Sequence, residues 1–369
     1  MGGLALTASL GAASPAAARA GSVTNLTGEP DAVSVVSASD AWATEGSNVM
    51  LHWNGTSWAQ VVFPEYGTGT VLDGVTALSA SDVWAVGDYG TSSLIEHWNG
   101  TSWAKVPSPS PGSGYGTFLE AVSATSASDA WAVGQYFAPG QILKGLSLIL
   151  HWNGTSWTRV ASPNPGDPET KDLDLAGLTS LSPSDAWVAG SYGTSAGQAR
   201  TLVLHWNGTK WTRVASPDPG TSENYLDGLS VVSASDIWAA GSYFPSGQPA
   251  QTLALHWDGT SWAQVATPDP GSGGSFLRGV AASSSSAAWA AGTYSVNQGA
   301  GERNLLLRWN GTSWSRVAVP DPGAALDQLT GVAAAGPADA WAVGWSVNSP
   351  TSLDKTVLLH WNGTSWGRY

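Results

Sequence analysis

The chain has 369 residues with 14 Lys or Arg, 27 Asp or Glu and a formal net charge of −13. This negative field and the absence of any Lys/Arg cluster argue against nucleic acid and anionic membrane surfaces as partners. The chain has no Cys, which excludes disulfides, thiolate metal sites and Cys nucleophiles. Charged residues make up 11% of the chain, beside 45 Gly and 22 Trp, a composition typical of many short strands joined by tight turns.

Residues 1–20 are interpreted as an export signal. Leu4 to Ala13 is a short run of small apolar residues, and Ala18-Arg19-Ala20 fits the small-x-small cleavage pattern, although no basic residue precedes Leu4. The alternative is a disordered Ala-rich tail. Residues 21–31 are then an N-terminal linker. No other stretch is apolar over the ~20 residues that span a bilayer, so we expect a secreted, extracellular protein without membrane insertion.

Seven repeats follow the linker, and each contains three Trp. The first Trp of a His-Trp-Asn-Gly-Thr-Ser-Trp motif falls at Trp53, Trp98, Trp152, Trp206, Trp257, Trp309 and Trp361. The second follows five residues later. The third lies upstream, in Ser-x-Ser-Asp-x-Trp-Ala-x-Gly or a variant, at Trp42, Trp84, Trp131, Trp187, Trp238, Trp289 and Trp341. A period near 50 residues with strand-like content predicts a β-propeller.

Each repeat divides into four strands, A to D, as the fourth repeat illustrates. We expect strand A at 175–181, strand B at 186–192, strand C at 201–206 and strand D at 210–215, from alternating apolar positions and β-branched residues. Asn-Gly at 207–208 predicts a tight C–D hairpin.

The predicted fold is therefore all-β, a seven-bladed β-propeller with four antiparallel strands per blade. The propeller spans 32–369. Its blades lie at about 32–64, 71–107, 118–163, 173–217, 225–268, 276–320 and 328–369.

Comparison of the repeats places the variable loops on one face. The A–B turn (Ser-Ala-Ser-Asp or near it) and the C–D turn (Asn-Gly, or Asp258-Gly259 once) hardly vary, whereas the B–C and D–A loops vary in length and content. In an up-and-down sheet the B–C and D–A loops emerge on the same rim, here named the loop face. The opposite rim is the turn face. Because function is usually carried by loops on a rigid scaffold, we expect the binding surface on the loop face. Neutral drift is the alternative.

An Asp and a His recur in six of the seven repeats. Asp precedes the strand-B Trp by two residues, and His precedes the first motif Trp; the sixth repeat has Ala287 and Arg308 in these places. Their joint loss predicts that the two side chains interact and satisfy each other's polar groups. Six equivalent copies indicate a structural role, not a catalytic one.

Aromatic residues are the candidate ligand-binding residues. A Tyr lies two residues past the strand-B Gly in five repeats, and further aromatic residues enter the same rim from the D–A side and from strand B of the last repeat. These rings can stack on sugars or on peptide side chains, or simply cover the blade cores. The candidates are Tyr89, Tyr136, Tyr192, Tyr243, Tyr294, Phe118, Tyr225, Phe276 and Trp345.

The region from about Ala32 to Tyr369 resembles bacterial secreted propellers of the kelch and Asp-box type. Asn-Gly-Thr-Ser-Trp at 54–58 and its six counterparts resemble a shortened Asp-box, with His52 or its equivalent where that motif has Ser. The convergent Arg and the Tyr/Glu pair of sialidases have no counterpart. The combination of Asp, His and Trp also resembles the structural tetrad of WD40 repeats. This resemblance implies the architecture and leaves the activity open.

Three functions are compatible with the sequence. The first is a secreted, monomeric, non-catalytic module that binds a glycan or an extracellular protein. The second is a structural or assembly scaffold of an extracellular complex. The third is a glycan-active hydrolase or lyase that uses loop carboxylates such as Glu169, Asp172 and Asp174 near the central channel. We find no motif for a phosphate loop, a metal site or a nucleophile elbow, and expect no catalytic residue, metal or cofactor.

Overall fold

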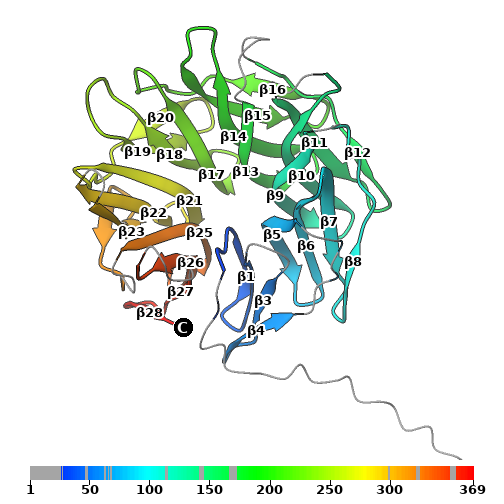
Figure 1. The fold of residues 1–369 in the computed structure, drawn as a ribbon, viewed down its shortest axis with the longest axis horizontal. Coiled ribbons are helices and arrows are strands. Elements are labelled where there is room, and N and C mark those ends of the chain that lie inside the picture. The colour runs from blue at the N-terminus through cyan, green and yellow to red at the C-terminus, as the bar shows by residue number, and fades with distance from the viewer. Residues whose placement is uncertain are drawn as a thin grey trace, which may run out of the picture.

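Each repeat forms one four-stranded antiparallel sheet, and seven such sheets are arranged in a ring (Figure 1). The structure is a computed structural model that describes residues 26–369 apart from 27, 46–48, 62–63, 65, 67–68, 113–114, 141–144, 166–172, 298–299, 321–324 and 350–354. The predicted export signal at 1–20 lies outside the described residues. Within them there is no helix, and hence none long and apolar enough to cross a membrane. The predicted seven-bladed all-β architecture is confirmed.

The strands succeed one another in each blade from the ring centre outward. The A strands are β1 (Val33–Ser37), β5 (Thr70–Ser79), β9 (Thr117–Ser126), β13 (Leu173–Ser182), β17 (Asn224–Ser233), β21 (Gly274–Ser284) and β25 (Leu326–Gly336). The B strands are β2 (Asp40–Thr44), β6 (Asp82–Tyr89), β10 (Asp129–Phe137), β14 (Asp185–Gly193), β18 (Asp236–Tyr243), β22 (Ala287–Asn297) and β26 (Asp339–Val347). The C strands are β3 (Met50–Trp53), β7 (Ser92–Trp98), β11 (Gly145–Trp152), β15 (Ala199–Trp206), β19 (Gln251–Trp257), β23 (Ala300–Trp309) and β27 (Lys355–Trp361). The D strands are β4 (Trp58–Val61), β8 (Trp103–Lys105), β12 (Trp157–Arg159), β16 (Trp211–Val214), β20 (Trp262–Val265), β24 (Trp314–Val317) and β28 (Trp366–Arg368).

The Asn-Gly turn between strands C and D is fixed by its own side chains. In blade 1 the Asn54 Oδ1 accepts hydrogen bonds from the Thr56 amide, the Thr56 hydroxyl and the Ser57 amide at 2.7–3.0 Å. Gly55 has φ = +90°, a conformation that costs other residues free energy. The same arrangement recurs in every blade, with Asp258 replacing Asn in blade 5. This explains why the turn scarcely varies.

Tryptophan trios hold neighbouring blades together. The strand-B Trp131 of blade 3 packs against Trp206 and Trp211 of blade 4, with ring centroids 5.1 and 5.2 Å apart. Corresponding trios lie at all seven interfaces, and the strand-B members are almost completely buried. A buried Trp removes about 200 Å² of surface from water, so these trios supply much of the packing between neighbouring sheets.

The A strands surround the ring axis and approach one another closely. A β-bulge lies just after a buried Leu in six of the A strands: β5, β9, β13, β17, β21 and β25. A Gly usually follows, and at Gly228 an added Cβ would lie 3.0 Å from the Gly279 Cα of the next blade. The bulged residue is left unpaired, and a bulge redirects its side chain. Bulge positions therefore control what the innermost strands present toward the axis.

Candidate binding face

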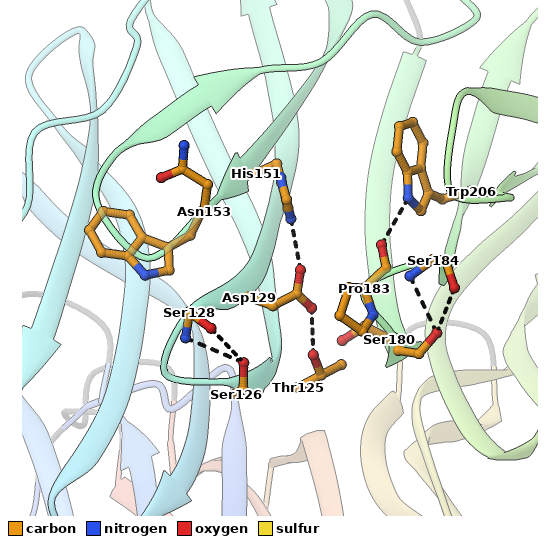
Figure 2. Close-up of polar contacts among 12 residues, drawn as sticks. Thr125, Ser126, Ser128, Asp129, His151, Asn153, Ser180, Pro183, Ser184 and Trp206 are labelled. Atoms are coloured by element: carbon orange, nitrogen blue, oxygen red, sulfur yellow. Dashed lines mark hydrogen bonds and ion pairs between the residues drawn. The ribbon is translucent and has the colours of Figure 1, made fainter.

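The six Asp–His pairs lie near the turn face and join the start of strand B to the end of strand C. Asp129 Oδ1 lies 2.8 Å from His151 Nε2, and the hydroxyl of Thr125 donates to the other carboxylate oxygen at 2.5 Å (Figure 2). The other five pairs have separations of 2.7–3.0 Å. The predicted interaction is thus confirmed.

Each His of these pairs also covers the strand-B Trp of its own blade. The rings of Trp131 and His151 have centroids 4.2 Å apart. In blade 6, which lacks the pair, the Arg308 guanidinium carbon lies 5.4 Å from the ring of Trp289 and 5.1 Å from that of Trp361. A cation above the indoles thus takes the place of the imidazole. The repetition of this packing around the ring marks the pair as a scaffold element.

Three of the predicted rim tyrosines stack under an Arg of strand D. The guanidinium carbons of Arg159, Arg213 and Arg316 lie 4.4 Å from the ring centroids of Tyr136, Tyr192 and Tyr294. Each Arg also donates to the Tyr hydroxyl. Two further tyrosines have other polar partners. Lys105 lies 3.7 Å from the Tyr89 ring centroid, and the Tyr243 hydroxyl donates to Gln251 at 2.5 Å.

The rim tyrosines differ in how much ring remains for a ligand. Tyr136 and Tyr294 are 7% and 8% exposed, while Tyr89, Tyr192 and Tyr243 are half-buried. The cationic partners were missed from the sequence. The signal was present, because repeats 2, 3, 4 and 6 all combine the strand-B Tyr with Lys or Arg two residues after the strand-D Trp.

The inner aromatic candidates form two clusters. In blade 3, Phe118 contacts Phe137 at a centroid distance of 6.3 Å, and the exposed Tyr115 adds a ring at 6.5 Å from Phe137. This is the blade 3 cluster. In blades 5 and 6, Phe244 lies between Tyr225 and Phe276, at 6.4 and 6.1 Å. This is the blade 5–6 cluster.

Trp345, the remaining candidate, lies in blade 7 and belongs to neither cluster. It pairs with Gln328 and Thr356 in the sheet and is half-buried. Tyr115, Phe137 and Phe244 were missed from the sequence, since they lie outside the positions that recur in every repeat.

Carboxylates occupy three of the bulge positions on the A strands. Asp73, Glu120 and Asp227 are the unpaired residues of the bulges in blades 2, 3 and 5. Burial raises the pKa of Asp73 to about 8, and the nearby charges of Glu120, Asp31 and Asp88 add to the effect. Burial and the carboxylates Asp174, Asp88 and Asp31 raise the pKa of Glu120 to about 7. Glu120 thus lies near enough to Asp73 of the neighbouring blade to raise its pKa, and Asp227 occupies the same bulge position in blade 5. The three are named the channel carboxylates.

Blade 6 breaks the acidic pattern with a cation at the bulge. Arg278 Nη1 lies 3.6 Å from Asp227 Oδ2 of blade 5, and its guanidinium carbon lies 5.8 Å from the Phe276 ring centroid. Burial raises the pKa of Asp227 to about 7 against the opposing effect of Arg278. The side chain of Arg278 is 48% exposed, so a cation adjoins the blade 5–6 cluster.

The arrangement offers stacking surfaces and acceptor oxygens. No group of three or more His, Cys, Asp or Glu suited to a metal ion occurs in the described part of the chain. Of the loop carboxylates considered from the sequence, Glu169 and Asp172 lie outside that part. The third, Asp174, lies in β13 and not in a loop, where it pairs with Ser191, and burial raises its pKa.

Comparison with known proteins identifies the fold. No protein-family model matches the chain, and no curated protein matches it in sequence. Among solved structures, YCF48 bound to D1 peptide is similar with a TM-score of 0.53 and 15% identity, over 88% of this chain and 91% of that chain. The RRP9 WD40 repeats give 0.59 and 10%, over 91% and 98%. A streptogramin B lyase gives 0.58 and 13%, over 86% and 92%. These are β-propellers. At such identities the likeness shows the fold alone.

Proposed function

We propose that this chain is a secreted, non-catalytic binding module that engages an extracellular protein partner through its loop face. The partner segment is extended and carries Lys or Arg beside apolar side chains. A glycan is the alternative ligand. The observation that carries the proposal is the combination of two clusters of aromatic rings with the channel carboxylates on the same innermost strands.

Charge favours a basic protein segment over a neutral glycan. The aromatic rings supply stacking surface for either ligand, because sugars and side chains both pack on π faces. The whole chain, however, carries −13, which attracts cations, and a cation near Glu120 or Asp227, whose pKa values are about 7, favours the ionised form of these carboxylates. The similar structure of YCF48 was solved with a peptide bound, so a ring of this architecture can hold a peptide.

Binding to a peptide array and to a glycan array tests this proposal. The probes are immobilised 12-residue peptides of graded charge and a panel of neutral and acidic glycans. We expect the chain to retain Lys/Arg-containing peptides, with binding weakened at least about tenfold in Phe244→Ala/Phe276→Ala, since such anchors carry most binding energy. Leu181→Ala, an exposed residue near the turn face, is the matched control and should bind like the wild type.

The arrays also separate the alternatives. Glycan binding that depends on Phe244 and Phe276 would favour a lectin-like role. Binding of peptides that is equal in both variants would overturn the loop-face placement. Retention of no probe by any variant would contradict the module and leave the scaffold of an extracellular complex as the favoured reading.

The raised pKa values of the channel carboxylates favour a second candidate function. A protonated carboxyl beside an ionised one is the equipment of a glycoside hydrolase, and Asp73 and Glu120 have pKa values of about 8 and about 7. Product release from a broad polysaccharide panel, abolished in Glu120→Gln, would support this candidate. No release from any polysaccharide would remove it.

A further inference from the structure

The seam between blades 7 and 1 contains a segment from the other end of the chain. Leu26 is buried in the cluster that joins the two blades, against residues such as Trp341 and Leu358. Its carbonyl accepts a hydrogen bond from the Thr356 amide at 3.2 Å. Residues 26 and 28–31 are here named the clasp. It lies beside β27 as an irregular segment and is not part of its sheet.

The clasp replaces a hydrogen bond that other blades form within their own repeat. In blades 3, 4 and 5 the equivalent strand-C amide donates to a side chain of the Pro-Asn-Pro or Pro-Asp-Pro segment after strand D. The Thr201 amide, for example, donates to Asp218 at 2.7 Å. The equivalent amide of blade 7, that of Thr356, donates instead to the main-chain carbonyl of Leu26 in the clasp. Blade 7 thus binds the main chain of the clasp where those blades bind a side chain.

Further contacts give the seam selectivity. The Thr330 hydroxyl donates to the Pro30 carbonyl, and the Asp31 amide donates to the buried Thr44 hydroxyl at 3.3 Å. A Cβ added to Gly28 would lie 2.5 Å from the Glu45 Cγ, so this place admits only Gly without rearrangement. A buried Leu, a Gly two residues later and a Pro carbonyl two residues beyond that define the sequence Leu-x-Gly-x-Pro.

From these contacts we infer that the seam is a peptide-binding groove for a Leu-x-Gly-x-Pro segment that bends at its Gly. The clasp is its resident occupant, and the groove also accepts the same segment as a separate peptide. Apolar burial of the Leu and main-chain hydrogen bonds supply the affinity. The groove lies at the blade 7–blade 1 seam, so it is distinct from the loop-face clusters of blades 3, 5 and 6.

The test uses the full chain with a weakened clasp. Leu26→Asp places a charge in the seam and should lower the melting temperature by several degrees. A synthetic peptide of residues 21–34 should then raise that temperature in a saturable manner, recovering roughly half of the loss at about ten times its Kd. The peptide with Gly28→Val should have no effect. The matched control chain is Leu181→Asp, which should melt like the wild type and ignore the peptide.

The outcomes decide between a groove and a purely local packing effect. Recovery of Leu26→Asp by the wild-type peptide alone supports the groove. No recovery, or equal shifts in Leu26→Asp and Leu181→Asp, overturns it. If Leu26→Asp fails to fold, the milder Gly28→Ala chain takes its place with the same peptides. Failure of the loop face to bind ligands would leave this result unaffected.

Discussion

The indole of Trp341 in blade 7 stands edge-on to that of Trp58 in blade 1, with centroids 4.9 Å apart and planes at 90°. Trp53 completes the trio at 5.0 Å from Trp341. The same trio joins every other pair of neighbouring blades. The first and last repeats, about 300 residues apart in the chain, therefore meet through the interface that sequential repeats use. Within the described residues, each of their two sheets consists of four consecutive strands of its own repeat.

Removing this indole is expected to open the seam. Trp341→Ala deletes a fully buried ring and should lower the free energy of unfolding by ~3–5 kcal/mol, the usual cost of a large aromatic truncation in a core. Trp131→Ala, at the blade 3–4 interface, is the matched variant and should cost a similar amount. Urea denaturation measures both. A seam variant as stable as the wild type would contradict the closed ring.

The Asp–His pair of blade 4 should contribute measurable stability. Asp185→Ala removes the partner of His205 Nε2, 3.0 Å away, and of Trp187 Nε1, 2.9 Å away. Polar groups left without a partner cost ~1–3 kcal/mol, so melting should occur at a lower temperature. A double-mutant cycle with His205→Ala isolates the pair, and strict additivity of the two single changes would rule out coupling between them.

The channel carboxylates should make the fold more stable in acid than in alkali. Folding raises the pKa of Asp73 from 3.8 to about 8, so the folded chain holds a proton that the unfolded chain releases. The resulting stability is fully present below about pH 4 and is lost as the pH rises to about 8. We expect Asp73→Asn to flatten this slope by roughly 1–3 kcal/mol, after allowance for residual solvent around the group.

Urea denaturation across this pH range measures the slope. Asp258→Asn is the control, because hydrogen bonds from Thr260 and Ser261 lower the pKa of Asp258 to about 2, below the range. Identical slopes in the wild type and Asp73→Asn would show that Asp73 does not retain its proton.

Truncation of the buried rim tyrosine Tyr136 should reduce the stability of the fold. Tyr136→Ala removes a ring that is 7% exposed and leaves Arg159 without its stacking partner, so we expect a loss of ~3 kcal/mol. Tyr136→Phe keeps the ring and loses only the hydrogen bond, at about 1 kcal/mol. Thermal melting compares the two. An unaltered melting temperature in Tyr136→Ala would mean that the ring is free for recognition.

The repeats made the fold predictable, because seven copies of one pattern show which positions are structural. The strand periods, the Asn-Gly turns and the Asp–His pairs could all be derived this way. The channel carboxylates could not, because a β-bulge at Asp73 or Glu120 shifts the register by one residue and alternation alone does not reveal it. The sequence leaves open that residues 22–27 join the last blade, but the burial of Leu26 in the seam depends on contacts between residues about 330 positions apart, which the repeats do not show.

The distance between spin labels across the seam tests the closed ring most directly. The chain has no Cys, so labels can be attached cleanly to Ser39→Cys in blade 1 and Ala338→Cys in blade 7, both exposed at equivalent A–B turns. The reference pair is Ser184→Cys and Ser235→Cys in the adjacent blades 4 and 5. Pulsed electron resonance should give the same mean distance for both pairs. A seam distance clearly longer than the reference would contradict the ring and every assignment of its faces.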